Sequence, residues 1–225
     1  MTSRHISTVV VDYGGVLTNP LQDTFAAFAE AVNVPLPELQ GAFARAAQRH
    51  GRSPMADLET ASCTEREMVE RVLVELPGNR TYAELLGGQE FGEVWFRART
   101  VNERLVRFLR ELRGNGYRTA LLTNNVVEWG PRWRAQLPVD ELFDAVVDSS
   151  AEGVRKPDPL IYRRLLERLP AAAHECLFLD DLDENCQAAS DLGMLAVHFT
   201  STDEAIDQIV DLLRSRGGSY ARSLV

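Results

Sequence analysis

The chain has 225 residues, of which 45% are hydrophobic, and its formal net charge is −9. This length and composition are typical of a globular protein with one sizeable core and room for a smaller appended module. No apolar run approaches the roughly 20 residues of a membrane span, and an acidic chain without a basic cluster lacks the charge that nucleic-acid binding requires. The three cysteines, Cys63, Cys176 and Cys186, show neither zinc-ligand nor disulfide spacing, which fits a reducing compartment. We therefore expect a soluble, cytoplasmic protein that binds neither membrane nor nucleic acid.

Five apolar segments rich in β-branched residues are predicted to be strands, and amphipathic helices separate most of them. The predicted strands are residues 7–12, 117–125, 143–150, 175–181 and 194–200. The predicted helices between them are residues 101–117, 157–170 and 185–193. Strands that alternate with helices of this length predict an α/β fold, a doubly wound parallel sheet covered on both faces. The polar residues that close the strands then meet at one edge of the sheet.

Residues 20–99 interrupt this alternation. Four segments have helical periodicity and prolines separate them, and none reads as a strand; they are residues 21–32, 36–51, 64–77 and 82–98. We therefore predict a helical cap inserted directly after the first strand of a core formed by residues 1–19 and 100–225. At the end of the chain, residues 215–225 are expected to be loosely held.

The polar residues at the predicted strand ends form a group suited to phosphate chemistry. They are Asp12, Thr123, Asn124, Asp180 and Asp181, together with Lys156, the single lysine among 24 lysine and arginine residues. Three carboxylates at one edge of a sheet repel one another unless a cation lies among them, and hard oxygen ligands favour Mg²⁺. A lysine and a threonine hydroxyl beside a carboxylate nucleophile supply the charge neutralisation and orientation that a transferring phosphoryl group needs. The pattern therefore predicts phosphoryl transfer through an aspartyl-phosphate.

Four segments in this order resemble the sequence motifs of the haloacid dehalogenase (HAD) superfamily. "VVVDYGGVLTN" is similar to the first motif, "ALLTNN" to the second, "RKPDPLIY" to the third and "LFLDDLDENCQAASDLGM" to the fourth. Within the superfamily the chain is most similar to the subgroup with a helical cap after the first motif, which includes the phosphatase-like N-terminal domain of soluble epoxide hydrolase. The resemblance implies a Mg²⁺-dependent hydrolase that acts on a small phosphate ester or anhydride.

The resemblance also implies a role for each residue of the group. Asp12 is the implied nucleophile, and Thr123 and Lys156 are the other implied catalytic residues. The residues implied to bind the phosphoryl oxygens of the substrate are Thr123, Asn124 and Lys156. The implied ligands of Mg²⁺ are Asp12, Asp180, Asp181 and the backbone carbonyl of Gly14.

Position 14 departs from the pattern of the family. Phosphatases of the superfamily usually carry a second aspartate two residues after the nucleophile, which protonates the leaving group and then activates water. Here that residue is Gly14. Because general acid and base catalysis contributes roughly 10² to 10⁴ in rate, or about 3 to 5 kcal/mol of barrier, its loss matters.

Three functions follow from this departure. The first is a phosphatase, weakened or selective for anomeric, acyl, enol or aryl phosphates, whose leaving groups need less protonation. The second is a catalytically impaired protein that binds phosphate or a partner, or that accumulates a phospho-aspartate. The third is a 2-haloacid dehalogenase, which uses no metal; Asp180 and Asp181 argue against it, because adjacent carboxylates beside a carboxylate nucleophile make little sense without Mg²⁺.

Several other residues have two interpretations each. Asn185 either braces Asp181 or lies on a helix surface. An aromatic group either lines the interface between cap and core or packs in the core; it consists of Phe91, Trp95, Phe96, Trp129 and Trp133.

Overall fold

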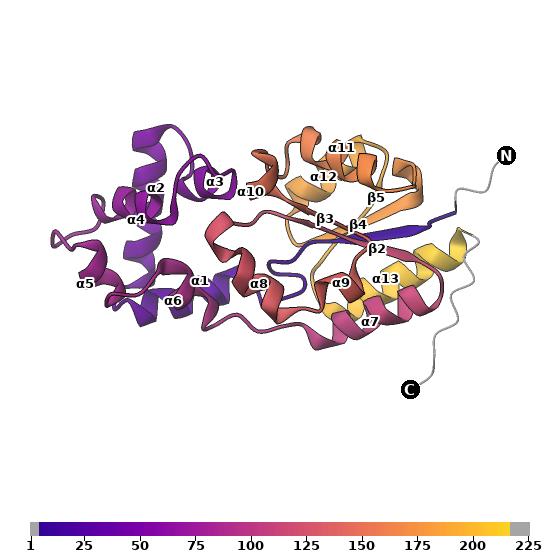
Figure 1. Ribbon diagram of the computed structural model, residues 1–225, viewed down its shortest axis with the longest axis horizontal. Coiled ribbons are helices and arrows are strands. Elements are labelled where there is room, and N and C mark those ends of the chain that lie inside the picture. Colours follow the sequence, from indigo (N-terminus) through magenta and orange to yellow (C-terminus); the bar gives the residue numbers. More distant parts are fainter. Residues whose placement is uncertain (1–4, 217–225) are drawn as a thin grey trace.

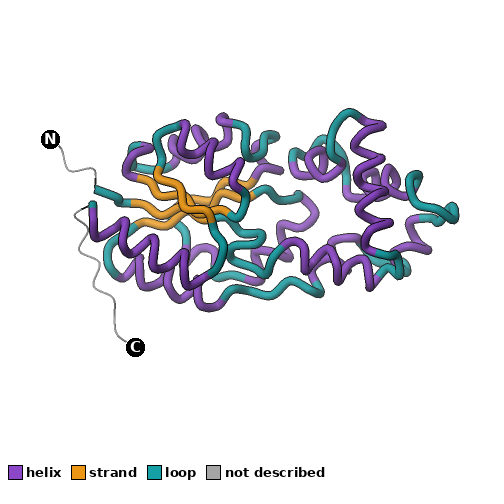
Figure 2. Tube along the Cα trace, turned by 180° about the vertical axis from the view of Figure 1, so that it is seen from behind, coloured by secondary structure: helices purple, strands orange, loops and turns teal. Residues whose placement is uncertain are grey.

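The computed structural model describes residues 5–216, so most of the tail, for which we expected loose attachment, lies outside the described residues. Within residues 5–216, no helix is long and apolar enough to cross a membrane. The described chain divides into a part that contains a sheet and a part made of helices and loops (Figure 2).

The sheet has five strands, and all of its pairings are parallel. The strands are β1 (Thr8–Val11), β2 (Arg118–Thr123), β3 (Ala145–Asp148), β4 (Cys176–Asp180) and β5 (Leu195–His198). Their order is β3-β2-β1-β4-β5, which places β1 in the centre with β2 and β4 at its sides. The predicted parallel α/β sheet is therefore confirmed, and each predicted strand corresponds to one observed strand.

Helices cover both faces of this sheet (Figure 1). One face packs against α7 (Glu103–Gly114) and α13 (Thr202–Ser215), and the other packs against α11 (Pro159–Arg168) and α12 (Asp183–Asp191). The valines of β1 contact both layers of helices. Val9 and Val11 belong to the apolar cluster that includes α7 and α13, whereas Val10 belongs to the cluster that includes α11 and α12. Alternate side chains of a strand point to opposite faces, so a strand made of valines is buried on both sides. The short helices of the core are η1 (Val127–Trp129), α8 (Gly130–Gln136), α9 (Val139–Leu142), α10 (Ser149–Glu152) and η2 (Ala173–Glu175).

Six helices lie between β1 and α7, within the predicted insertion. They are α1 (Leu21–Ala31), α2 (Leu36–His50), α3 (Pro54–Glu59), α4 (Glu65–Leu73), α5 (Tyr82–Leu86) and α6 (Phe91–Phe96). The six helices and the segments that join them, residues 20–98, are called the cap below. The stretch predicted as one helical segment, 82–98, contains two short helices, because Gly87 adopts a left-handed conformation that ends α5. The cap has its own apolar core, in which Phe28, Leu39 and Met68 are buried.

The chain leaves and re-enters the core through two segments that lie side by side. Thr18 and Val101 form an isolated antiparallel bridge, and the amide of Asn102 donates to the carbonyl of Leu17 at 2.8 Å. These contacts hold the cap at the edge of the sheet where β1 ends. The cap therefore faces the strand ends at which the polar residues were predicted to gather.

Trp129 joins the cap to the core. It comes from the core, yet it packs in the apolar cluster of the cap, stacked on Phe91 with ring centroids 5.9 Å apart. Its indole Nε1 donates to the carboxylate of Glu65 at 2.8 Å. Trp133 instead lies in the core against Tyr13. Of the two interpretations that the sequence leaves open, Trp129 therefore fits contact between cap and core, and Trp133 fits packing in the core.

Candidate active site

The carboxyl ends of β1, β2 and β4 bring the predicted residues together. Asp12 directly follows β1, and its backbone amide donates to the carbonyl of Leu179 in β4 at 2.9 Å. Thr123 and Asp180 are the last residues of β2 and β4, the two neighbours of β1. Because parallel strands in register end at one edge, three residues that are far apart in the chain become neighbours.

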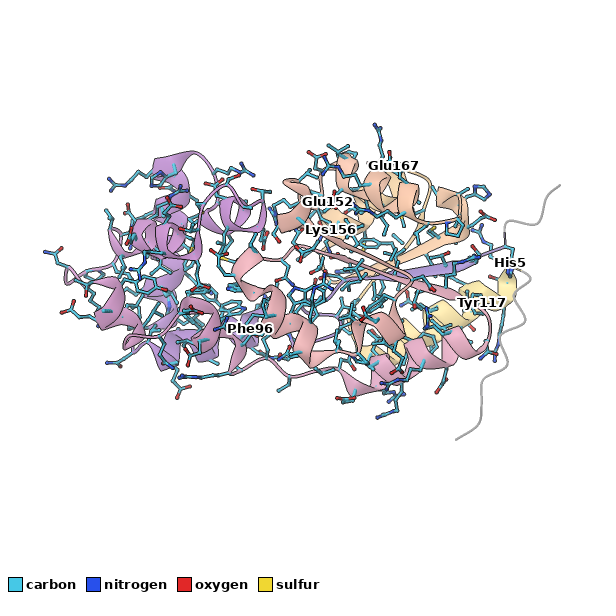
Figure 3. All side chains as sticks on the ribbon, viewed as in Figure 1. His5, Phe96, Tyr117, Glu152, Lys156 and Glu167 are labelled. Atoms are coloured by element: carbon cyan, nitrogen blue, oxygen red, sulfur yellow. The ribbon has the colours of Figure 1, made fainter. Side chains whose placement is uncertain are left out.

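Lys156 reaches this edge from the segment that follows α10. Its Nζ donates to Oδ1 of Asp12 at 2.7 Å and to Oδ2 of Asp180 at 2.6 Å, and its side chain is 1% exposed. Burial by itself lowers the pKa of Lys156, but the carboxylates of Asp12 and Asp180 outweigh burial and raise it. Lys156 is therefore a charged ammonium that joins two carboxylates. In Figure 3 it lies at the end of the sheet that faces the cap.

Asn124 holds the backbone of Lys156 in place. Its side-chain Nδ2 donates to the carbonyl of Lys156 at 3.1 Å, and its Oδ1 accepts from the amide of Lys156 at 2.8 Å. An amide side chain that pairs with both backbone groups of one residue fixes the direction in which that residue points. Asn124 therefore positions the lysine as well as lining the site.

Both carboxylate oxygens of Asp180 accept hydrogen bonds from protein donors. Its Oδ1 accepts from the backbone amide of Leu182 and from Nδ2 of Asn185, both at 2.9 Å, while its Oδ2 accepts from Lys156. The expectation that Asn185 braces Asp181 or lies on a helix surface is wrong: this residue is 2% exposed and bonds to Asp180. The reason is that the first turn of α12 packs under the end of β4, where Asp180 is fully buried.

The three carboxylates form a group that fits a hard cation. One oxygen from each of Asp12, Asp180 and Asp181 lies within 4.8 Å of the others. Burial raises the pKa of Asp12 to about 7, and the charges of Asp180 and Asp181 add to this effect against the opposing effect of Lys156. Burial, followed by the charge of Asp180, also raises the pKa of Asp181. Since one lysine leaves excess negative charge in a buried place, a divalent cation with oxygen preference suits this donor set.

The two glycines after Tyr13 serve different purposes. Gly15 has a positive φ of +84°, and a Cβ added there would lie 2.2 Å from Oδ2 of Asp181. Gly14 has no such restriction, because a Cβ added there would meet only ordinary contacts, 3.5 Å from Nη2 of Arg99 and from a methyl group of Leu21. Gly15 therefore makes room for a candidate metal ligand, whereas Gly14 faces the guanidinium group of Arg99.

A cavity of about 450 Å³ opens over these groups, between the core and the cap. Its floor includes Asp12, Gly14, Asn124, Lys156 and Asp181. Its apolar wall consists mainly of cap side chains: Leu21, Phe25, Phe43, Met55, Trp95 and Phe96. In Figure 3, Phe96 and Lys156 lie on the cap side and the core side of this region. Thr123 and Asp180 are fully buried behind the floor, and neither lines the cavity.

This fold and this arrangement of residues agree with the family comparison. A family model for haloacid dehalogenase-like hydrolases matches residues 6–193 of the chain. The chain belongs to the haloacid dehalogenase-like hydrolases. The resemblance inferred from the four motifs is therefore confirmed at the level of the family.

Curated relatives of this HAD-like hydrolase match about half of the chain. Acyl-CoA dehydrogenase family member 10 from Mus musculus is 36% identical over 111 residues, which are 48% of this chain and 10% of that protein. Bifunctional epoxide hydrolase 2 from Mus musculus is 30% identical over 116 residues, 50% of this chain and 21% of that protein. Sesquiterpene phosphatase astK from Aspergillus oryzae is 35% identical over 99 residues, 44% of this chain and 50% of that protein. The matched part thus spans between 10% and 50% of the length of these relatives.

Solved structures of HAD proteins share the fold over most of the chain. A HAD-like family hydrolase from Porphyromonas gingivalis superposes with a TM-score of 0.68 at 22% identity, covering 93% of this chain and 98% of that chain. A HAD family enzyme from Bacteroides thetaiotaomicron, solved with magnesium and inorganic phosphate, superposes with a TM-score of 0.63 at 19% identity, covering 88% and 96% of the two chains. At these identities the similarity establishes the fold.

Two charged groups of the HAD-like hydrolase's cavity lie outside the four motif segments and were not identified from the sequence. Glu59, at the end of α3, lines the cavity and lies 2.7 Å from Nε of Arg155, and burial raises the pKa of Glu59. Arg99, where the chain returns from the cap, is 8% exposed and lies beside Gly14. Both residues come from segments without a motif, so no local pattern distinguishes them from the other charged residues of the chain.

Proposed function

We propose that this HAD-like hydrolase is a Mg²⁺-dependent phosphatase that acts on a small phosphorylated substrate through an aspartyl-phosphate on Asp12. The observation that carries the proposal is the single buried ammonium of Lys156, which lines the cavity and bonds at once to Asp12 and Asp180. The names of curated relatives, which include a sesquiterpene phosphatase and a glyceraldehyde 3-phosphate phosphatase, support the same reaction class.

In this proposal Asp12 is the nucleophile. Its Oδ1 is held by Lys156, which leaves its second oxygen free to attack phosphorus. Lys156 neutralises negative charge on the phosphoryl oxygens, and Asn124 keeps the lysine in position through its two backbone hydrogen bonds. Thr123, at the end of β2, lies fully buried behind the cavity floor, where its hydroxyl donates to the carbonyl of Asn124 at 3.4 Å, and in this proposal it supports the phosphoryl site from beneath. Positioning of the reactants and electrostatic stabilisation are the main sources of rate enhancement in phosphoryl transfer.

Asp12 and Asp181 would hold Mg²⁺ directly, with Asp180 behind them and the backbone carbonyl of Gly14 as the further ligand. The structure fits this role, since the three carboxylates converge and the charge of Lys156 alone does not balance them. When bound, Mg²⁺ supplies charge neutralisation at the phosphoryl oxygens.

In this proposal the cap covers one side of the site and limits the access of water to the reaction. Glu59 pairs with Arg155 of the core at 2.7 Å, and its backbone carbonyl accepts from the hydroxyl of Ser149 at 2.6 Å. Trp129 and Glu65 form a second connection. A covered site strengthens electrostatic interactions with the substrate and protects the intermediate from uncontrolled hydrolysis.

A second candidate function rests on Gly14. Because this position carries no acid or base, the phospho-aspartate could form and persist, so that the protein would bind phosphate or a partner instead of turning over a substrate. In that case intact-mass measurement after incubation with acetyl phosphate finds a phosphate adduct that accumulates and that Asp12→Asn lacks.

Phosphate release from a panel of phosphate esters and anhydrides, with and without Mg²⁺, tests the proposal. The expected result is Mg²⁺-dependent multiple turnover in the unmodified protein and none in Asp12→Asn. A stable adduct without turnover supports the second function instead. Release that Asp12→Asn retains, or that EDTA does not reduce, contradicts both.

A further inference from the structure

Arg99 takes up the space next to position 14, where a HAD phosphatase usually carries its proton donor. Its Nη2 and Nη1 lie 3.5 and 3.8 Å from the point where a Cβ of residue 14 would be. A side chain at position 14 would therefore begin in van der Waals contact with the guanidinium group. The group nearest to this position in the protein is thus a permanent cation without a proton to give at neutral pH.

Arg99 is buried but incompletely paired. It is 8% exposed, its Nη1 donates to the hydroxyl of Thr18 at 2.6 Å, and its Nε has no hydrogen-bond partner. Among residues 5–216, no carboxylate forms an ion pair with Arg99; the rings of Tyr13 and Trp95 lie 5.8 and 5.7 Å from its guanidinium carbon. A buried charge without a counter-charge is costly. The cavity that it lines therefore has a place for an anion.

The place for an anion beside Arg99 remains when a divalent cation is bound to the three carboxylates. Asp12, Asp180 and Asp181 carry three negative charges. Lys156 and one divalent cation carry three positive charges and balance them. Glu59 and Arg155 balance each other at 2.7 Å. Among the described residues of the cavity wall, the charge of Arg99 is then the one that no carboxylate pairs with, and it lies on the side of Gly14.

The rest of the cap side of the wall is mostly apolar, although Gln22 and Gln40 also line it. Phe25, Phe43 and Met55 come from the cap helices, and Trp95 and Phe96 close the side next to Arg99. A cavity of about 450 Å³ with such a wall accommodates a hydrocarbon body beyond the phosphoryl group. Besides Glu59, which pairs with Arg155, the cap offers a sugar or another polyhydroxylated leaving group mainly Gln22 and Gln40, so most of its hydroxyls would lose hydrogen bonds to water on entry.

We propose that Arg99 replaces the missing acid by stabilising a leaving group that departs as an anion, so that the preferred substrates are phosphoric anhydrides carried on an apolar body, such as prenyl diphosphates. This inference rests on the phosphatase function proposed above. It deepens that function by naming the substrate class and an additional catalytic residue.

The reaction balances without a proton donor. An oxygen of Asp12 bonds to the terminal phosphorus, the bond from that phosphorus to the bridging oxygen breaks, and the electron pair stays on the departing prenyl monophosphate next to Arg99. Water then attacks the phosphorus of the aspartyl-phosphate dianion, and the bond to Asp12 breaks. The products are the Asp12 carboxylate and dihydrogen phosphate, which keeps both protons of the water. An alkyl monophosphate, in contrast, would have to release a strongly basic alkoxide.

A matched pair of substrates tests the inference. Geranyl diphosphate and geranyl monophosphate share one hydrocarbon but differ in their leaving group. The diphosphate releases geranyl monophosphate, a phosphate anion, whereas the monophosphate releases the alkoxide of geraniol. We expect kcat/KM for the diphosphate to exceed that for the monophosphate by about 10² to 10⁴, the range that general acid catalysis normally covers. Methyl diphosphate, which lacks the hydrocarbon, is expected to react at least about 10²-fold less well than geranyl diphosphate because it buries little apolar surface.

Variants of Arg99 separate catalysis from folding. Arg99→Met is expected to lower kcat on geranyl diphosphate by about 10² to 10³ and to lower the slow monophosphate reaction by a clearly smaller factor, while Arg99→Lys retains part of the preference. The matched control is Arg97→Met, because the side chain of Arg97 is 54% exposed and pairs only with Glu93 on the surface. Thermal unfolding of each variant verifies that it is folded.

Two results would overturn the inference. One is equal turnover of the two geranyl substrates; the other is a loss in Arg99→Met that is the same for both, which indicates a structural role. If neither substrate releases phosphate in a Mg²⁺- and Asp12-dependent manner, but other phosphates do, the substrate class is wrong and the phosphatase function stands. If no phosphate is released from any substrate, the phosphatase function itself has failed.

Discussion

The carboxylate of Asp181 lies where a side chain on Gly15 would begin, with its Oδ2 2.2 Å from the position of a Cβ. Gly15 also has a φ of +84°, which a side chain disfavours. Two constraints therefore favour glycine at position 15: its backbone has a positive φ, and the carboxylate of Asp181 occupies the space that a side chain would need.

Replacing Gly15 with alanine is expected to disturb the metal site. The new methyl group must displace Asp181, so we expect the affinity for Mg²⁺ to fall by about 10- to 100-fold, as it does when the support of a metal ligand is lost. The measurement is the increase in the thermal unfolding midpoint on titration with Mg²⁺. Gly116→Ala is the control, since Gly116 has nearly the same φ, +85°, and open space around its Cβ position. Equal Mg²⁺ affinity in the two variants would contradict the prediction.

Removing the ammonium of Lys156 is expected to destabilise the protein strongly. Lys156→Met leaves Asp12 and Asp180 buried without their cation, and breaking such a pair costs about 3–5 kcal/mol of unfolding free energy. Urea denaturation without metal measures the loss. In a double-mutant cycle, Asp180→Asn should recover part of the loss, because it removes one of the unpaired charges. Strict additivity of the two substitutions would show that the ion pairs are not coupled.

Asn124→Ala is expected to affect kcat more than KM. The two hydrogen bonds to the backbone of Lys156 are worth about 0.5–1.5 kcal/mol each, and a displaced lysine no longer faces the phosphoryl group. We predict a fall in kcat of about 10- to 100-fold in steady-state assays with the best phosphate substrate. Asn115→Ala removes a comparable side-chain to backbone bond on the far side of the core and should leave kcat unchanged. A change in KM alone would mean that Asn124 contacts the substrate and does not position Lys156.

Glu65 is expected to hold the cap together and to fix it to the core. Its carboxylate accepts from the backbone amides of Phe91 and Gly92 at 2.6 and 2.9 Å, and from the indole of Trp129 at 2.8 Å. Glu65→Ala leaves three buried donors without their acceptor. Each unsatisfied donor costs about 1–3 kcal/mol, so we predict a loss of about 3 kcal/mol or more in unfolding free energy. Urea denaturation followed by tryptophan fluorescence measures it. The exposed Glu70, replaced by alanine, serves as the control and should change stability little.

Much of the candidate site follows from local sequence. Asp12, Thr123 and Asp180 each end an apolar run, and parallel strands bring such ends to one edge whatever connects them. Lys156 stands out because it is the single lysine of the chain. Its contacts with Asp12 and Asp180 agree with the group that the sequence predicts, while the chemical roles of these residues remain proposals.

The sequence by itself thus determined the α/β class of the fold, the order of its strands along the chain and the residues at their ends, because apolar periodicity and strand ends are local properties. Only the tertiary structure decided what faces Gly14, since Arg99 is distant in sequence and reaches that position through the path of the whole cap. The same holds for Asn185, which the packing of α12 directs to Asp180, and for Glu59, which the cap brings over the core. Contacts between segments that are far apart depend on how helices pack, and no local pattern encodes that geometry.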